Sequence, residues 1–186
     1  MGDQELWDAA VTGDAEAFGE LFGRHHDAVY NYCFRRVASW SVAEDLVSAV
    51  FLEAWRTRRR LVLDTGSLLP WLIGVATRVT HRHRRSGTRY DALLRRIPAG
   101  PPEPELAETV AAKIDDERRM ADVLAAIAGL PKRERDVIAV CVFGELDYAS
   151  AAIALGVPVG TVRSRLSRAR RRLAALVPPV PLSSNR

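Results

Sequence analysis

Arginine dominates residues 163–172, where six of the ten positions carry a guanidinium group. Guanidinium pairs bidentately with phosphate oxygens and with guanine edges, so such a group of side chains suits contact with nucleic acid. Apolar residues recur through the run at steps of four, three and four, which predicts an amphipathic helix from about residue 158 to 175. Its buried seam would consist of Val162, Leu166, Ala169 and Leu173.

The residues around this helix predict a helix-turn-helix. Asp147 can cap a short helix, and Gly156 can turn the chain before the longer one. The second helix of such a motif offers long donors to base edges in the major groove. Five side chains lie outside the seam: Arg163, Ser164, Ser167, Arg168 and Arg171. We expect the first four of these to contact bases. We expect phosphate contacts from Thr161, Arg165, Arg170 and Arg172. The simpler alternative is an amphipathic helix with an arginine-rich solvated face.

A second arginine group lies earlier in the chain, and each group follows an acidic block. Residues 1–55 hold three basic and ten acidic side chains, and residues 56–96 hold eleven basic and two acidic ones. Residues 97–160 hold six basic and eleven acidic side chains, and residues 161–186 hold seven basic and no acidic ones. The formal net charge of the 186 residues is therefore only +4. Two separate basic groups at the ends of helical segments favour two nucleic-acid contacts, although acidic polymers or lipid headgroups could attract them as well.

The rest of the composition argues against several classes of protein. No stretch approaches the roughly 18 consecutive apolar residues of a membrane span, and the N-terminus is too acidic for a secretory signal. Two cysteines are too few for a disulfide scaffold, which suits a reducing cytosol. The pairs His25–His26 and His81–His83 match no metal-ligand spacing, and no phosphate loop or nucleophile motif appears. We therefore expect no metal, no cofactor and no catalysis.

Helical periodicity dominates the chain and predicts an all-α fold of two small domains. Residues 1–87 would form the first domain, with a helix near residues 4–12, one capped by Asp14, one opened by a capping box at residues 41–44, and one from about 68 to 85. Four prolines within residues 98–104 predict a flexible linker at residues 88–112. The second domain would span residues 113–177, followed by a disordered tail at residues 178–186.

Several segments resemble a known family in the same order and spacing. The family is the extracytoplasmic-function (ECF, group 4) sigma factors of bacterial RNA polymerase. Residues 43–47 (AEDLV) and 51–55 (FLEAW) resemble region 2.2 of this family, and residues 71–76 with Arg84 and Arg85 resemble its regions 2.3 and 2.4. The strings LPKRERDV (130–137), LDY (146–148) and GVPVGTVRSRLSRAR (156–170) resemble region 4 of the same family. The resemblance covers nearly the whole chain and implies that the two expected domains are sigma regions 2 and 4.

The resemblance implies a role for each surface. Region 2.2 of the family docks on the clamp helices of the polymerase β′ subunit, and the implied contacts here are Glu44, Asp45, Ser48 and Leu52. Regions 2.3 and 2.4 melt and read the minus-ten promoter element, which implies contacts from Arg78, Arg82, Arg84 and Arg85. Trp71 is either a stacking platform for a base or a core residue. Region 4 reads the minus-thirty-five element with the helix of residues 158–175.

The resemblance implies promoter recognition and DNA opening for core RNA polymerase. The partners of the protein would be the β′ and β subunits of the polymerase, promoter DNA and an anti-sigma factor. The protein would be located in the cytoplasm. Two alternatives come from the residues themselves. A free-standing helix-turn-helix regulator would dimerise on palindromic operators. An enzyme acting on nucleic acid would need a catalytic constellation, which we do not find in the sequence.

Overall fold

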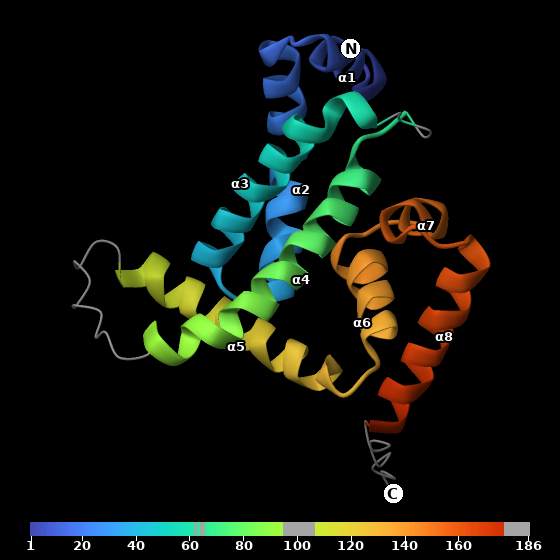
Figure 1. Ribbon diagram of the computed structural model, residues 1–186. Helices are drawn as coiled ribbons and strands as arrows, with labels where there is room; N and C mark the ends of the chain where they lie inside the picture. The colour runs from blue at the N-terminus through green and yellow to red at the C-terminus, as the bar shows by residue number, and fades with distance from the viewer. Residues whose placement is uncertain (62, 64–65, 95–106, 177–186) are drawn as a thin grey trace, which may run out of the picture.

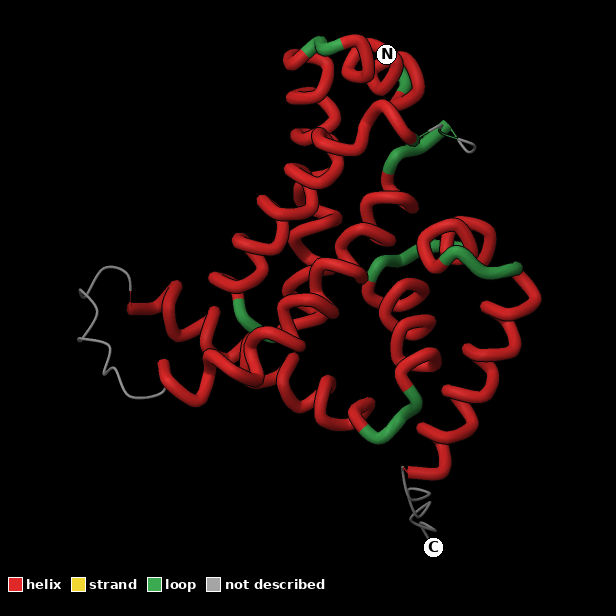
Figure 2. Tube along the Cα trace, viewed as in Figure 1, coloured by secondary structure: helices red, strands yellow, loops and turns green. Residues whose placement is uncertain are grey.

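The computed structural model describes residues 1–61, 63, 66–94 and 107–176, and their side chains except at 86–94, 107–110 and 176. Within these ranges the chain is helical, without strands, and short loops join the helices (Figures 1 and 2). The elements are α1 (Asp3–Thr12), α2 (Ala15–Val37), α3 (Trp40–Thr57), η1 (Arg58–Arg60), α4 (Leu69–Leu94), α5 (Ala107–Ala128), α6 (Lys132–Ile138), η3 (Ala139–Phe143), α7 (Tyr148–Leu155) and α8 (Val159–Leu176). The all-α prediction is confirmed. In the same ranges every helix is too short or too polar to cross a bilayer.

Helices α2, α3 and α4 pack together, and α1 covers one end of them (Figure 1). The cap predicted for α2 is present, because Oδ1 of Asp14 accepts hydrogen bonds from the N–H groups of Glu16 and Ala17 at 2.9 and 3.0 Å. Leu21 of α2 and Val50 of α3 are completely buried between the helices. The facing sides of α2 and α3 therefore contribute apolar residues to the core.

Asp3 fixes α1 to this core. Its carboxylate is 7% exposed and accepts hydrogen bonds from the Leu68 N–H at 2.8 Å and the Arg24 guanidinium at 2.7 Å, and Nε2 of His25 lies 2.7 Å from it. Burial raises the pKa of Asp3, but the hydrogen bonds from Leu68 and Arg24 and the proximity of His25 outweigh it, so the pKa lies below its ordinary value. One buried carboxylate thus joins α1, α2 and the start of α4.

The start of α3 differs from the prediction. The helix begins at Trp40, with Ser39 as the N-cap residue, and the Ser39 side chain makes no capping hydrogen bond. Instead, the Trp40 N–H donates to Oε1 of Glu117 on α5 at 2.8 Å. The predicted capping box at residues 41–44 is therefore wrong, because a carboxylate distant in sequence satisfies the first N–H group of the helix.

The C-terminal half contains the predicted helix-turn-helix. Oδ1 of Asp147 caps α7 by accepting from the Ser150 N–H at 2.7 Å, and Gly156 ends that helix with φ at 61°, a value that favours glycine. Helix α8 then packs on α6 and α7. Before them, α6 continues into the π-helical segment η3, which leads to the loop before Asp147.

The two halves pack against each other in what we call the closed arrangement: α4 lies on α7, and α2 lies on η3. At this contact Arg35 of α2 donates to the carbonyl oxygen of Phe143 at 3.0 Å. Nearby, Asp136 of α6 accepts from Arg36 at 3.3 Å and lies 2.9 Å from Nε2 of His81 on α4. The buried apolar residues of both halves form one continuous cluster.

Helix occupies both ends of the segment predicted as a linker. Helix α4 extends to Leu94 and α5 begins at Ala107, whereas the linker was expected at residues 88–112. The prolines of residues 98–104 and the expected tail at 178–186 lie outside the described residues. The proposed division into domains at these boundaries stays a prediction.

Candidate nucleic-acid interface

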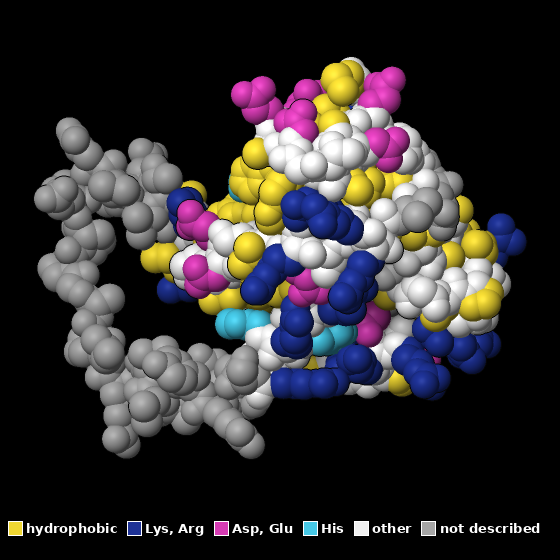
Figure 3. All heavy atoms as spheres, turned by 45° about the horizontal axis from the view of Figure 1, so that its top comes forward, with side chains coloured by type: hydrophobic (Ala, Val, Ile, Leu, Met, Phe, Trp, Pro, Cys, Tyr) yellow, Lys and Arg dark blue, Asp and Glu magenta, His cyan; other side chains and the backbone are white. Residues whose placement is uncertain are grey.

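Helix α8 separates a buried seam from an exposed basic surface. Val162, Leu166 and Ala169 are at most 2% exposed, because they pack on α6 and α7. Thr161 and Arg165 are half-buried at the edges of the seam. The remaining candidates lie on the exposed side of the helix: Arg163, Ser164, Ser167, Arg168 and Arg171. Across the face drawn in Figure 3, Lys and Arg side chains gather from the centre to the lower edge, whereas many of the Asp and Glu side chains lie near the upper end and others lie at the left and in the centre.

A shallow cavity of about 420 Å³ accompanies the exposed side of α8, and Tyr148 of α7 forms one wall of it. The Arg163 guanidinium lies over the Tyr148 ring, 5.7 Å from its centroid, so a cation–π contact orients this arginine. Tyr148 was not among the predicted site residues. The signal for it was an aromatic residue directly after the capping Asp147, on the shorter helix of the motif.

Arg172 has a partner inside the protein. Its Nη1 lies 3.2 Å from Oε2 of Glu134, a carboxylate on α6 that is 6% exposed. This ion pair joins α8 to α6, so in this structure Arg172 serves packing. Arg170, the neighbouring phosphate candidate, is exposed.

Three of the four minus-ten candidates on α4 share one groove. Arg78, Arg82 and Arg85 line a depression of about 310 Å³ together with Glu53. Arg82 donates a hydrogen bond to the Glu53 carboxylate, which holds the guanidinium against α3. Among the described residues that line it, the groove therefore presents clustered positive charge with Glu53 as a counter-charge. Arg84 lines a different cavity, between the two halves, and Arg85 lines both.

Trp71 combines the two roles that the sequence left open. Its ring lies 6.0 Å from that of the buried Trp7, so part of it packs in the core. Another part lines a cavity of about 240 Å³ with Arg60 and Arg78, at the start of the loop that leads from η1 to α4. Trp71 thus offers an aromatic wall beside two guanidinium groups.

The candidates for polymerase contact lie on one exposed surface of α3. Glu44, Asp45 and Ser48 are exposed, and Leu52 exposes 55% of its surface. The adjacent Phe51 is buried. The surface consequently combines two carboxylates with an apolar side chain that has no role in the core.

The histidines and cysteines form no further site. Among the described residues no group of three His, Cys, Asp or Glu side chains could hold a metal ion. Burial raises the pKa of Cys33 to about 12, although the nearby Arg36 acts in the opposite direction. This thiol is therefore protonated and acts as a small apolar core residue.

The described residues are helical and include a helix-turn-helix whose second helix is covered with arginine, so the chain belongs to the helix-turn-helix class. Comparison with known families makes this more specific: residues 21–90 match Sigma-70 region 2, and residues 120–173 match Sigma-70, region 4. The chain belongs to the ECF RNA polymerase sigma factors, because it is more than 30% identical to members of this family over most of its length.

Three relatives illustrate the similarity. The chain is 33% identical over 171 residues to the ECF RNA polymerase sigma factor SigE of Mycolicibacterium smegmatis, across 88% of this chain and 63% of SigE. It is 32% identical over 145 residues to the RNA polymerase sigma factor HrpL of Pseudomonas syringae, across 78% of each chain. It is 31% identical over 176 residues to the ECF RNA polymerase sigma factor SigM of Mycobacterium tuberculosis, across 94% of this chain and 84% of SigM. The match thus spans less than two thirds of SigE.

Two solved structures share the fold. CnrH, in complex with the cytosolic domain of CnrY, superposes with a TM-score of 0.68 at 24% identity over 94% of this chain and 96% of CnrH. The sigma factor RpoE of Bartonella quintana, in complex with the anti-sigma factor NepR, superposes with a TM-score of 0.57 at 22% identity over 87% of this chain and 97% of RpoE.

Proposed function

We propose that this chain is a sigma subunit that confers promoter recognition and DNA opening on core RNA polymerase in transcription initiation. Membership of the ECF family supports this function. The structural observation that carries it is the exposed side of α8, where Arg163, Ser167 and Arg168 lie opposite a seam that holds the helix in place.

The minus-thirty-five element would be read by α8. Arg163 and Arg168 reach bases, with Arg163 oriented by the ring of Tyr148. A bidentate arginine–guanine pair contributes about 1–3 kcal/mol of discrimination against the wrong base. The half-buried Thr161 and Arg165 at the edges of the seam contact the phosphates that set the register.

The minus-ten element would be held by α4. DNA opening requires cations for the freed strand and a surface on which an unstacked base can rest. The groove of Arg78, Arg82 and Arg85 supplies the cations, and the cavity beside Trp71 supplies the aromatic surface. Arg84 and Arg85 both line the cavity between the halves in the closed arrangement, so both become fully accessible to DNA when the halves separate.

Core polymerase would be bound through α3. The exposed Glu44 and Asp45 attract a basic partner surface, and Leu52 supplies an apolar contact beside them. We assign the β′ and β subunits as the partners in this assembly. The chain itself supplies no catalysis, and it acts in the cytoplasm, where the polymerase is.

Promoter binding would require the closed arrangement to open. A compact chain of this length has a radius of gyration of about 16 Å. The positions in their names place the minus-ten and minus-thirty-five elements about 25 base pairs apart, which corresponds to about 85 Å of B-form DNA at about 3.4 Å per base pair. Both elements can be contacted at once only after α4 has left α7 and α2 has left η3.

An anti-sigma factor is the remaining proposed partner. CnrH and the RpoE of Bartonella quintana were both solved bound to another protein, and NepR is an anti-sigma factor. The exposed surfaces of α3 and α8 are available to such a partner here.

Run-off transcription with purified core polymerase tests the proposal. We expect promoter-dependent transcripts with the full chain, and a loss of at least tenfold for the double variant Arg163→Gln/Arg168→Gln, since each base contact contributes about 1–3 kcal/mol. The matched control is Arg118→Gln/Arg119→Gln, which removes two exposed arginines of α5. Absence of a promoter-dependent transcript from any genomic fragment would refute the proposal. A dimer in size-exclusion chromatography that does not bind core polymerase would instead favour a free-standing regulator.

A further inference from the structure

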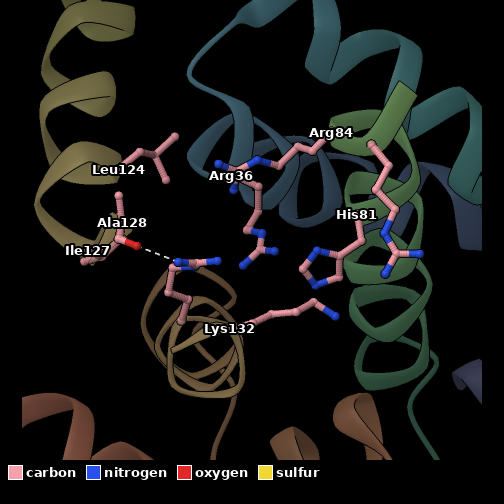
Figure 4. Close-up of a pocket in the computed structure, with 9 residues that line it drawn as sticks. Arg36, His81, Arg84, Leu124, Ile127, Ala128 and Lys132 are labelled. Atoms are coloured by element: carbon pink, nitrogen blue, oxygen red, sulfur yellow. Dashed lines mark hydrogen bonds between the residues drawn. The ribbon is translucent and has the colours of Figure 1, made fainter. Parts of the chain in front are cut away.

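A cavity of about 390 Å³ lies between the two halves of the molecule. Figure 4 shows Leu124, Ile127 and Ala128 of α5 on one side of it and His81 of α4 on the other, with Arg36 between them. The N-terminal half contributes the end of α2 and residues 81–85 of α4, and the C-terminal half contributes α5 and α6. The charged residues that line it are Arg36, Arg84, Arg85, Lys132 and Arg135.

The described walls of the cavity carry several positive charges. No carboxylate is among the residues that line it in the described part of the chain. The nearby Asp136 already interacts with Arg36 and His81. Burial lowers the pKa of Arg84, and the nearby charges of Arg36 and Arg135 lower it further, while Asp136 acts in the opposite direction. A bound anion would relieve this repulsion.

Arg36 gives the cavity a buried donor. The residue is 4% exposed, and its Nε has no hydrogen-bond partner among the described residues. A buried charged donor without a partner is costly, and its cost is offset when an acceptor is bound. Figure 4 shows the Arg36 side chain directed into the space between α5 and α4.

The cavity also has an apolar wall. Leu124 and Ile127 of α5 face the cations across the space, so an occupant meets positive charge on one side and aliphatic carbon on the other. Its volume falls in the range of about 300–1,000 Å³ that is usual for small-molecule sites. A bare inorganic anion would leave the apolar wall unused.

We propose that this cavity binds a small phosphorylated molecule with an apolar or aromatic portion, of the size and chemistry of a nucleoside diphosphate. The phosphates pair with Arg36, Arg84 and Lys132, and the ring system packs on Leu124 and Ile127. Arginine and lysine supply the charge-assisted hydrogen bonds that phosphate recognition requires.

Binding at this place favours the closed arrangement. Because the walls come from both halves, the ligand has its full set of contacts only while the halves stay packed, and a ligand stabilises the state that it prefers. It also occupies Arg84, a candidate for the minus-ten contact. This consequence rests on the proposed function, whereas the binding itself does not.

Isothermal titration calorimetry of the full chain tests the binding, with ADP, inorganic pyrophosphate and adenosine as probes. We expect ADP to bind more tightly than pyrophosphate and adenosine not to bind measurably. Lys132→Gln should weaken the binding of ADP about tenfold, because a charge-assisted hydrogen bond contributes about 1.4 kcal/mol or more. The matched control is Arg133→Gln, an exposed neighbour on α6 that does not line the cavity and should stay within about twofold of the parent.

Three results would overturn the proposal. The first is no heat of binding with millimolar ADP while circular dichroism shows a folded chain. The second is an equal loss of affinity for ADP in the Lys132→Gln and Arg133→Gln variants. The third is a Lys132→Gln variant that loses affinity for a random-sequence DNA duplex and keeps its affinity for ADP, which would assign these cations to DNA phosphates. None of these measurements uses transcription, so failure of the proposed function does not affect them.

Discussion

Gly74 of α4 lies against the backbone carbonyl of Ala154 in α7. A Cβ atom at position 74 would come within 2.6 Å of the Ala154 carbonyl oxygen, closer than real Cβ contacts allow. The absence of a side chain at this one position therefore lets α4 and α7 pack in the closed arrangement. Neither backbone can yield easily, because each belongs to a helix.

Gly74→Ala should separate the two halves while both remain folded. The added methyl group has no space at α7 and costs about 1–3 kcal/mol there, whereas alanine favours the helix itself. Small-angle scattering should report a larger radius of gyration, with helix content by circular dichroism unchanged. The control is Gly19→Ala in α2, where a Cβ meets nothing within 4 Å. An unchanged radius for Gly74→Ala would contradict the role assigned to this contact.

The contact between His81 and Asp136 should make the packing of the halves depend on pH. Burial lowers the pKa of His81, and Arg36 and Lys132 lower it further, while Asp136 opposes them, so the pKa lies below its ordinary value of 6.5. A solvated histidine then binds a proton more readily than the packed one, and acid favours separation. Stability is fully present above about pH 6.5 and falls as the pH drops below it.

Urea denaturation between about pH 7.5 and 5.5 tests this expectation, because the free energy of unfolding follows the difference in bound protons. The parent chain should lose more stability than His81→Gln, whose amide can still donate to Asp136 without titrating. Equal losses in the two proteins would show that another group causes the pH dependence.

The sequence predicted those features that depend on neighbouring residues. Asp14 and Asp147 cap their helices through N–H groups two or three residues away, and Gly156 adopts the left-handed conformation that its turn requires. The seam of α8 was also predictable, because helical spacing alone places its residues on one side.

Features that join distant segments were not predictable in this way. The first N–H group of α3 is satisfied by Glu117, 77 positions away, so the local pattern at residues 41–44 indicated the wrong start. The Arg36–Asp136 contact spans 100 positions, and nothing in the spacing of either residue indicates the other. The same holds for the cavity between the halves, whose walls meet only after both halves have folded.

Asp3→Asn should destabilise the N-terminal half by about 2–4 kcal/mol near neutral pH, because it removes the charge from a buried carboxylate that Arg24, His25 and the Leu68 N–H engage. The pKa of Asp3 lies below its ordinary value of 3.8, so the stabilisation is present above that pH and is lost as the pH falls through the lowered pKa. The free energies of unfolding of parent and variant should therefore converge in acid. Asp8→Asn, on the exposed side of α1, is the control and should change stability by less than about 0.5 kcal/mol.

The pair of Arg172 and Glu134 distinguishes a packing role from a phosphate contact on α8. Arg172→Met leaves the carboxylate of Glu134 buried without its cation, which should cost about 1–3 kcal/mol of stability. The double variant Arg172→Met/Glu134→Gln removes both charges and should regain much of that loss, so a thermal-denaturation double-mutant cycle measures the coupling. Arg170→Gln, at the exposed neighbouring position, should leave stability unchanged and weaken DNA binding. If Arg172→Met instead keeps full stability and weakens DNA binding as Arg170→Gln does, then Arg172 contacts phosphate and its pairing with Glu134 is incidental.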